Sequence, residues 1–485
     1  MSFNIPEKGR PFDEILQELD SFGSDDPLYK EARTWSLVYY LDQEYTDFLV
    51  EAYAKYFSAN GLNPSVFKSL KRLEKEILKF TAELLHVDDK ACGILTSCGT
   101  ESCMLAVKTY RDHGRARGIR KPEMILPETA HVAWGKGSEY FGVKIRRAPL
   151  AADYGVDVAV VEKLVNRNTV MILGSAPEYP HGIIDPIAAL GKVAERHHIP
   201  LHVDSCVGGY ILPFVEMNGT ELPPWDFRVP GVTSMSADIH KYGYAAKGAS
   251  CILYRSIDYF KHQIFVDQDF PGGVFASPGL LGTRPGGAYA AAWASIQAHG
   301  LEGYKELAKR TIDLTEKFIE GINAIDGLEV IGKPQASLFA YRSTTPELNI
   351  FIVGDLMEEK GWQLDRLQRP DGLHAMVTAG HDRIAQQYLA DLRDSVAEAI
   401  AHPELGESGQ AATYGMISHI PLRGMVRKQV GDMFAGTYIL SGGEIDLSDS
   451  ESLASGSGAE GDDTTNKGIL QKIIDWYVKR QMQKN

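Results

Sequence analysis

The chain is poor in cysteine and has no long apolar run. Of its 485 residues only five are cysteine, and their spacings do not match a metal site. An odd and sparse set also argues against a secreted disulfide framework, so we expect a reduced, cytoplasmic setting. No run approaches the roughly 20 apolar residues of a membrane-spanning helix, and the N-terminal residues lack the apolar core of a signal peptide.

Positive charge is also in short supply. The 50 lysine and arginine residues are outnumbered by 64 aspartate and glutamate residues, which gives a formal net charge of −14. This excess argues against a general nucleic-acid binder, because phosphate would be repelled over most of the surface. Local basic pockets for small phosphates remain compatible with it.

Hydrophobic periodicity predicts an α/β protein. Residues 1–90 read as helices, chiefly Tyr39–Phe57 and Val66–Leu85, because apolar residues recur at spacings of three and four. From residue 91 to about 310, short apolar runs alternate with helical segments. That alternation is typical of a mostly parallel sheet covered on both faces, and we expect the large domain here.

The C-terminal third reads as a smaller α/β domain followed by a tail. We expect this domain at residues 311–440, with Ile350–Val353 as a strand. The segment 441–485 begins with a stretch rich in Gly, Ser, Asp and Glu, which indicates disorder, and ends in a helical pattern over 469–483. That helix either docks on protein or, as the alternative, binds a membrane surface.

A first candidate site lies where an early strand meets a helix. Gly99 permits close approach of a ligand to the backbone, and the free N–H groups of a helix start suit a phosphate. Ser97 and Thr100 add hydroxyl donors. A plain capped helix start has the same appearance, so this turn alone does not decide between the two interpretations.

Two further candidates follow later strands. His131 comes after the run Met124–Leu126 and could stack on a planar cofactor, although a lone histidine is commonly just a partly buried polar residue. Asp204 ends an apolar strand, where a carboxylate is costly to bury unless it is paired. It either pairs with a protonated pyridine nitrogen or serves as a helix cap or salt-bridge partner.

The last candidate is the pair His240-Lys241, after the run Val232–Met235. A lysine amine can bind a carbonyl cofactor covalently once it has lost its proton, and a histidine beside it can contact phosphate. Alone, Lys241 would be an ordinary solvated lysine. The order of phosphate turn, His131, Asp204 and His-Lys is what indicates a pyridoxal phosphate site.

These residues lie in stretches that resemble a known family. The chain resembles the pyridoxal-phosphate-dependent group II decarboxylases, and within them the carbon–carbon lyases. The matching stretches are 96–102, 140–145, 180–186, 202–210, 226–248 and 275–287. The resemblance implies an α/β fold of the PLP-dependent transferase type (aspartate aminotransferase, fold type I), with a mostly parallel central sheet and a smaller C-terminal α/β domain.

The resemblance also implies roles for individual residues. Lys241 would bind pyridoxal 5'-phosphate covalently and be the catalytic residue, Asp204 would pair with the ring nitrogen, and His131 would stack on the ring. The phosphate would be held by Gly99, Thr100 and His240, together with Gly282 and Thr283 from the partner in an obligate homodimer with shared active sites. Substrate-binding residues would be Tyr39, Asn63 and Lys247. The alternatives are a surface lysine for Lys247 and, equally, a packed helix tyrosine for Tyr39.

For the lyase group, the implied reaction is cleavage of a phosphorylated long-chain amino alcohol to a fatty aldehyde and phosphoethanolamine. Three positions depart from the group. Asn63 stands where His is usual and cannot carry a proton at neutral pH, Cys98 replaces a glycine in the phosphate turn, and Gly135 replaces a common Asn. Amino-acid decarboxylation is therefore the alternative reaction. A non-catalytic scaffold is disfavoured by the intact Lys241 and Asp204, and a dinucleotide-binding protein by the lack of G-x-G-x-x-G after the first strand.

Overall fold

The computed structural model describes residues 5–6, 8–24, 26–63, 65–407, 409–411, 423–436 and 438, so the predicted tail at 441–485 lies outside it. The α-helices are α1 (Phe12–Phe22), α2 (Gln43–Ala54), α3 (Lys68–Leu84), α4 (Gly99–Ala116), α5 (Val132–Phe141), α6 (Val158–Leu164), α7 (Ile187–His197), α8 (Leu212–Met217), α9 (Ile257–Phe260), α10 (Gly286–Asn323), α11 (Ile350–Glu359), α12 (Ala385–Ala401) and α14 (Arg423–Gly436). Short 3-10 helices are η1 (Tyr29–Glu31), η2 (Gly208–Tyr210), η3 (Ala379–Ile384) and η4 (Pro403–Glu407).

The strands form three sheets. The largest has seven strands in the order β1-β7-β6-β5-β4-β2-β3, the second has the order β10-β11-β13-β12, and the third is the hairpin β8-β9. Their bounds are β1 (Cys92–Thr96), β2 (Glu123–Pro127), β3 (Lys144–Ala148), β4 (Thr169–Ser175), β5 (Leu201–Asp204), β6 (Val232–Ala237), β7 (Ser250–Tyr254), β8 (Phe265–Asp267), β9 (Phe275–Ser277), β10 (Leu328–Val330), β11 (Leu338–Ser343), β12 (Asp365–Leu367) and β13 (Gly372–Met376).

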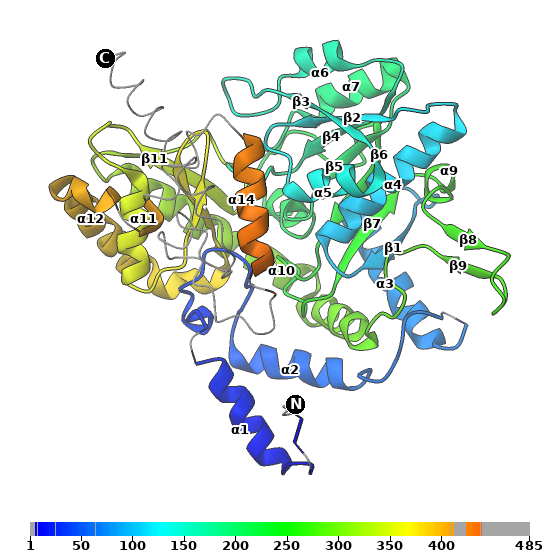
Figure 1. The fold of residues 1–485 in the computed structure, drawn as a ribbon, viewed down its shortest axis with the longest axis horizontal. Coiled ribbons are helices and arrows are strands. Elements are labelled where there is room, and N and C mark those ends of the chain that lie inside the picture. Colours follow the sequence, from blue (N-terminus) through cyan, green and yellow to red (C-terminus); the bar gives the residue numbers. More distant parts are fainter. Residues whose placement is uncertain are drawn as a thin grey trace, which may run out of the picture.

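The seven-stranded sheet is mostly parallel, which confirms the prediction. Strands β3, β2, β4, β5 and β6 pair in parallel, and only β7 runs antiparallel to its neighbours β1 and β6. Its two faces belong to different apolar cores: Ile125 packs in the cluster of Leu190 in α7, whereas Met124 packs in the cluster of Val107 in α4. Alternate residues of a strand thus pack against helices on opposite sides of the sheet. Figure 1 shows α7 and α4 on these two sides.

The second sheet lies beside the first and is linked to it by α10 (Figure 1). Its core contains residues of α11 and α12 as well as β11 and β13. The prediction of a strand at Ile350–Val353 is wrong, because these residues begin α11. Asn349 caps that helix by accepting a hydrogen bond from the N–H of Phe351 at 3.0 Å. A short, continuous apolar run fits a buried helix as well as a strand, so periodicity could not separate them.

The segment before α2 packs into the core of the second sheet. Trp35 is fully buried, with its ring 4.9 Å from that of Phe318 and 4.3 Å from that of Tyr388. The helix predicted from Tyr39 starts only at Gln43, because Asp42 adopts an extended conformation and caps it. The predicted domain limits near residues 90, 310 and 440 remain a proposal. Within the described residues, no helix is both long enough and apolar enough to cross a bilayer.

Candidate active site

The candidate residues gather at one edge of the large sheet. Asp204 is the last residue of β5, and Lys241 lies four residues beyond the end of β6. His131 immediately precedes α5, and Gly99 begins α4 just after β1. Ligands of open α/β sheets bind at the carboxyl ends of the strands. The topology therefore places these four residues at the same end of the sheet.

Lys241 is paired with an acidic residue that sequence reasoning did not single out. Its Nζ lies 3.0 Å from Oδ2 of Asp238, and the other oxygen of Asp238 accepts a hydrogen bond of 2.6 Å from the hydroxyl of Ser250. Burial opposes the charge on Lys241, but the carboxylate of Asp238 outweighs it and holds the pKa of this ammonium group above its usual value. Asp238 thus holds the amine in place at the end of the sheet.

His240 is fixed beside this pair. Its Nδ1 donates a 2.6 Å hydrogen bond to the carbonyl oxygen of Ala249, which leaves Nε2 facing the carboxylate of Asp238 at 3.8 Å. Burial lowers the pKa of His240, although Asp238 acts in the opposite direction. The ring therefore has a fixed orientation next to the lysine.

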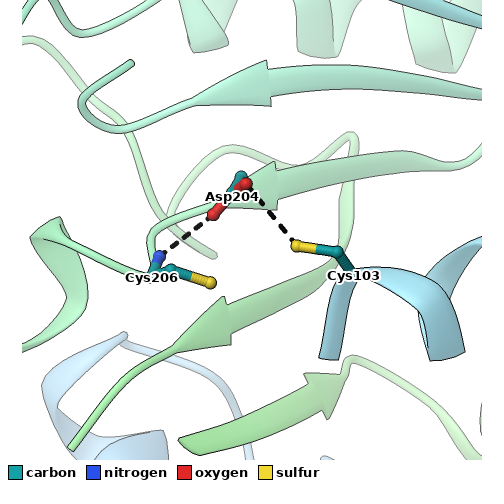
Figure 2. A group of neighbouring side chains, drawn as sticks. All are labelled: Cys103, Asp204 and Cys206. Atoms are coloured by element: carbon teal, nitrogen blue, oxygen red, sulfur yellow. Dashed lines mark hydrogen bonds between the residues drawn. The ribbon is translucent and has the colours of Figure 1, made fainter. Parts of the chain in front are cut away.

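Asp204 is buried yet remains ionised. Its Oδ2 accepts a 2.9 Å hydrogen bond from the indole N–H of Trp134, and its Oδ1 accepts one of 3.1 Å from the backbone N–H of Cys206 (Figure 2). Burial raises the pKa of Asp204, but His131 and the Trp134 hydrogen bond outweigh burial and hold the pKa below its usual value. A buried carboxylate of this kind calls for a cationic partner.

The turn before α4 forms a tight cradle. A Cβ atom on Gly99 would lie 2.7 Å from Oδ2 of Asp238 and 2.8 Å from Sγ of Cys206, so only glycine fits. Glu101 braces this turn, since its Oε2 accepts hydrogen bonds of 2.8 Å from the backbone N–H and the hydroxyl of Ser97. The first N–H groups of α4, including that of Thr100, have no acceptor within the helix.

His131 is exposed, and its ring contacts that of a tyrosine that the sequence analysis did not identify. The ring of Tyr179 meets that of His131 edge-on at 6.0 Å and stacks on that of His374 at 4.3 Å. The hydroxyl of Tyr179 donates a 2.8 Å hydrogen bond to Oδ2 of Asp365 in β12. Burial and Asp365 together raise the pKa of Tyr179, so this hydroxyl keeps its proton. Tyr179 thereby connects the second sheet to His131.

Lys247 and Tyr39 lie together near the same lysine. The Nζ of Lys247 is 4.9 Å from the centre of the Tyr39 ring and 3.5 Å from the carbonyl oxygen of His240, which accepts a hydrogen bond from it. Burial, reinforced by the charge of Lys241, lowers the pKa of Lys247 to about 8. Tyr39 contacts Sδ of Met376 through its hydroxyl. The pair offers a cation and a hydroxyl beside Lys241.

The remaining predicted residues make their contacts elsewhere. Thr283 accepts a 3.3 Å hydrogen bond from the side chain of Asn60, and Gly282 borders open space. The side chain of Asn63 accepts a hydrogen bond of 2.9 Å from the backbone N–H of Ser65, within its own turn. Gly135 likewise has open space where a side chain would be. The hydrogen bonds of Thr283 and Asn63 do not involve Lys241 or Asp204.

The residues present fit pyridoxal phosphate. Covalent attachment of this cofactor needs a lysine, its ring nitrogen needs an ionised acid, and its phosphate needs donors close to the backbone. Lys241, the ionised Asp204 and the turn at Gly99 supply these three features at one end of the sheet. The cofactor is pyridoxal phosphate.

Known proteins with related sequences support this assignment. Residues 33–344 match the family described as the pyridoxal-dependent decarboxylase conserved domain. The chain is 46% identical to sphingosine-1-phosphate lyase of Oryza sativa, over 78% of this chain and 71% of that protein. It is 41% identical to sphingosine-1-phosphate lyase 1 of Rattus norvegicus, over 85% of this chain and 73% of that one.

Solved structures give the same picture of the fold. A sphingosine-1-phosphate lyase of Burkholderia pseudomallei superposes with a TM-score of 0.80 at 37% identity, over 90% of this chain and 97% of that one. A glutamate decarboxylase of Lactobacillus brevis superposes with a TM-score of 0.72 at 21% identity, over 82% of this chain and 95% of that one. The second likeness concerns the fold alone.

Proposed function

Because the chain belongs to the pyridoxal-dependent decarboxylase family, we propose that it is a carbon–carbon lyase of the sphingosine-1-phosphate lyase type. Its substrate would be a phosphorylated long-chain amino alcohol, and its products a fatty aldehyde and phosphoethanolamine. The fold supports this assignment: it is that of the PLP-dependent transferases of fold type I.

The observation that carries the proposal is a second cation near Lys241, the ammonium group of Lys247. Lys247 lies beside Tyr39 and close enough to Lys241 for their charges to interact. Lys241 is committed to the cofactor and Asp238, so Lys247 is a cation left for a phosphate on the substrate. An amino-acid decarboxylase, the alternative function, has no phosphate on its substrate to bind.

Each residue then has a role in the proposed reaction. Pyridoxal phosphate, when bound, delocalises the electron pair left on the carbon beside the amine. Asp204 holds a positive charge at the ring nitrogen, and His131 orients the ring. The helix start at Gly99 and Thr100 binds the phosphate, with His240 beside it. Lys241 carries the cofactor and exchanges protons at Nζ, while Tyr39 and Lys247 orient the substrate.

One assay separates the two reactions. The purified protein is incubated either with a phosphorylated long-chain amino alcohol or with a panel of amino acids, and aldehyde and carbon dioxide are measured. We expect aldehyde and phosphoethanolamine from the amino alcohol phosphate. Carbon dioxide from an amino acid, without aldehyde from the phosphate, would instead establish the decarboxylase.

Binding of a phosphorylated substrate should weaken in alkaline solution. Because the pKa of Lys247 is about 8, its ammonium group is charged below that pH and neutral above it. The charged fraction falls about tenfold per pH unit beyond the pKa, so KM should rise between pH 8 and 9.5. A Lys247→Arg variant keeps its charge and should show a flatter KM profile. Identical profiles for the two proteins would remove Lys247 from phosphate binding.

Tyr179→Phe should slow turnover without unfolding the protein. The substitution keeps the ring against His131 and His374 but removes the hydrogen bond to Asp365. A hydrogen bond to a charged group is worth about 1.5–3 kcal/mol, so we expect kcat to fall about tenfold or more as His131 loses its support. The control is Tyr254→Phe, which removes a buried hydroxyl bonded to Thr109 outside the candidate active site. Equal kcat losses in both would indicate a general stability effect.

We also propose an obligate homodimer in which Gly282 and Thr283 of the partner subunit contact the cofactor phosphate. The segment just before them exposes many large apolar side chains, in the projecting hairpin β8-β9 and the following loop (Figure 1). These are Phe265, Val266, Phe270, Val274, Phe275, Leu280 and Leu281. An apolar surface of this kind is typical of a protein interface. Leu280 is tied to the phosphate turn, since its N–H donates a 3.0 Å hydrogen bond to Oε1 of Glu101.

Mixed dimers test the shared site. Lys241→Ala removes the covalent attachment, and Thr283→Asp places a negative charge against the phosphate, so each variant alone should be inactive. When the two are unfolded and refolded together, half of the dimers are mixed, and each mixed dimer has one intact site if Thr283 acts across the interface. Activity should recover to about a quarter of the wild-type value. No recovery, with mixed dimers present, would place Thr283 in its own subunit's site.

A further inference from the structure

Two buried thiols lie against Asp204 and have no part in the proposed reaction. Cys103 of α4 is 1% exposed, and Cys206, two residues after β5, is 7% exposed. The Sγ of Cys103 is 3.6 Å from Oδ2 of Asp204, and the two sulfurs and a carboxylate oxygen all lie within 4.8 Å of one another. Figure 2 shows the three side chains converging from α4, from β5 and from the turn that follows β5.

We propose that Cys103, Cys206 and Asp204 bind one thiophilic divalent ion, Zn²⁺ or Cd²⁺, when the cofactor is absent, and that this ion prevents pyridoxal phosphate from binding. The metal site depends only on the three side chains. The exclusion of the cofactor rests on the role proposed above for Asp204.

The donor set and its geometry suit such an ion. Two sulfurs and a carboxylate oxygen are ligands of Zn²⁺ and of its softer congener Cd²⁺, and water can take the fourth position. Around one tetrahedral ion the ligand atoms are about 3.3–3.8 Å apart. The two sulfurs and the carboxylate oxygen lie within 4.8 Å of one another, so side-chain shifts of about 1 Å would bring them to these separations. Trp134 and the backbone N–H of Cys206 already orient the carboxylate, as neighbouring groups do at metal sites.

The charges around the cluster favour a cation. The carboxylates of Asp204 and Asp238 both interact with the thiols. These two negative charges attract a cation to the cluster. On coordination each thiol becomes a thiolate and releases its proton to solvent, so two protons leave for each ion bound.

Metal and cofactor would compete for the same carboxylate. An ion bound to Asp204 neutralises the charge that would otherwise hold the protonated ring nitrogen. It would also lie next to Gly99, because Cys206 Sγ is only 2.8 Å from the position of a Cβ on that residue. The cradle of the cofactor phosphate is therefore within reach of the ion.

The test titrates CdCl₂ into the full chain after its cofactor has been removed with hydroxylamine. Binding is followed by the ultraviolet absorption of cadmium thiolate, and cofactor uptake by visible absorption after pyridoxal phosphate is added. We expect one ion per chain, loss of cofactor uptake in the cadmium-loaded protein and recovery with EDTA. Cys103→Ser and Cys206→Ser should each weaken cadmium binding at least tenfold.

Two cysteines outside the cluster, Cys92 and Cys251, serve as matched controls. Cys92→Ser and Cys251→Ser should bind cadmium like the wild type, and cofactor uptake by the cadmium-free Cys103→Ser protein reports that it is folded. If Cys103→Ser fails to fold, the loss of cadmium binding is tested with Cys206→Ala instead. Absence of the thiolate absorption, unchanged binding in the cluster variants, or normal cofactor uptake by cadmium-loaded protein would overturn the proposal. A chain that never takes up pyridoxal phosphate but binds cadmium through Cys103 and Cys206 would refute the proposed function and leave the metal site standing.

Discussion

Lys241→Ala will abolish covalent retention of the cofactor and lower turnover by at least about a thousandfold, because the variant lacks the amine proposed to attach the cofactor. Among the described residues, Lys241 is the lysine that Asp238 holds at the end of β6, with Nζ 3.0 Å from the carboxylate. The wild-type protein should be yellow and should retain the cofactor covalently after borohydride reduction. Mass spectrometry of peptides from the reduced protein locates the attachment.

Lys261→Ala is the control for this experiment. Lys261 lies on the surface and pairs with Asp258, so its loss should leave colour and turnover unchanged. Covalent retention of the cofactor by the reduced Lys241→Ala protein would show that another lysine is the attachment site. Because the variant retains Asp204 and the cradle at Gly99, non-covalent binding of the cofactor can still be measured by dialysis.

Asp204→Asn should reduce turnover by about a thousandfold while the fold persists. Asparagine has the same size, and its oxygen can still accept the hydrogen bond from Trp134 that Asp204 accepts at 2.9 Å. It carries no charge, so a proton on the ring nitrogen is no longer stabilised and the cofactor becomes a weaker electron acceptor. We expect a shifted visible spectrum and at least tenfold weaker cofactor binding.

The comparison for Asp204 is another buried acid, Asp226, which pairs with His86 and Arg228 outside the candidate active site. Asp226→Asn should lower the melting temperature but leave kcat close to its wild-type value. If Asp204→Asn retained more than about a third of the wild-type turnover, the charge of Asp204 would not be needed by the cofactor.

The sequence was sufficient to locate the candidate residues at or just after the end of a strand. Asp204 and Lys241 follow apolar runs, and the carboxyl ends of parallel strands share one edge, so their proximity follows from the pattern. Asp238 precedes Lys241 by three residues, a spacing that one turn of chain can close, and it could have been found by the same reasoning. The hydrogen bond between Asp238 and Ser250, which lies on the antiparallel neighbour β7, could not be predicted from the sequence.

Contacts between the two sheets were beyond sequence reasoning. Tyr179 lies in the turn after β4 of the large sheet, whereas Asp365, 186 positions later, lies in β12 of the second sheet, so no local pattern connects them. The α11 residues Ile350–Val353 were mistaken for a strand, since burial on all sides removes the periodicity that distinguishes the two structures. In both cases tertiary packing, rather than local preference, decides the outcome.

The burial of Trp35 has a consequence for synthesis of the chain. Its ring packs against Phe318 and Tyr388, which the ribosome adds about 280 and 350 residues later. At roughly 5–20 residues per second, that delay is about 14–70 s. During this interval the large sheet can form, whereas the early segment around Trp35 still lacks its partners. The emerging chain therefore exposes a tryptophan for tens of seconds, and a chaperone that shields this segment would matter more to yield than one acting on the sheet.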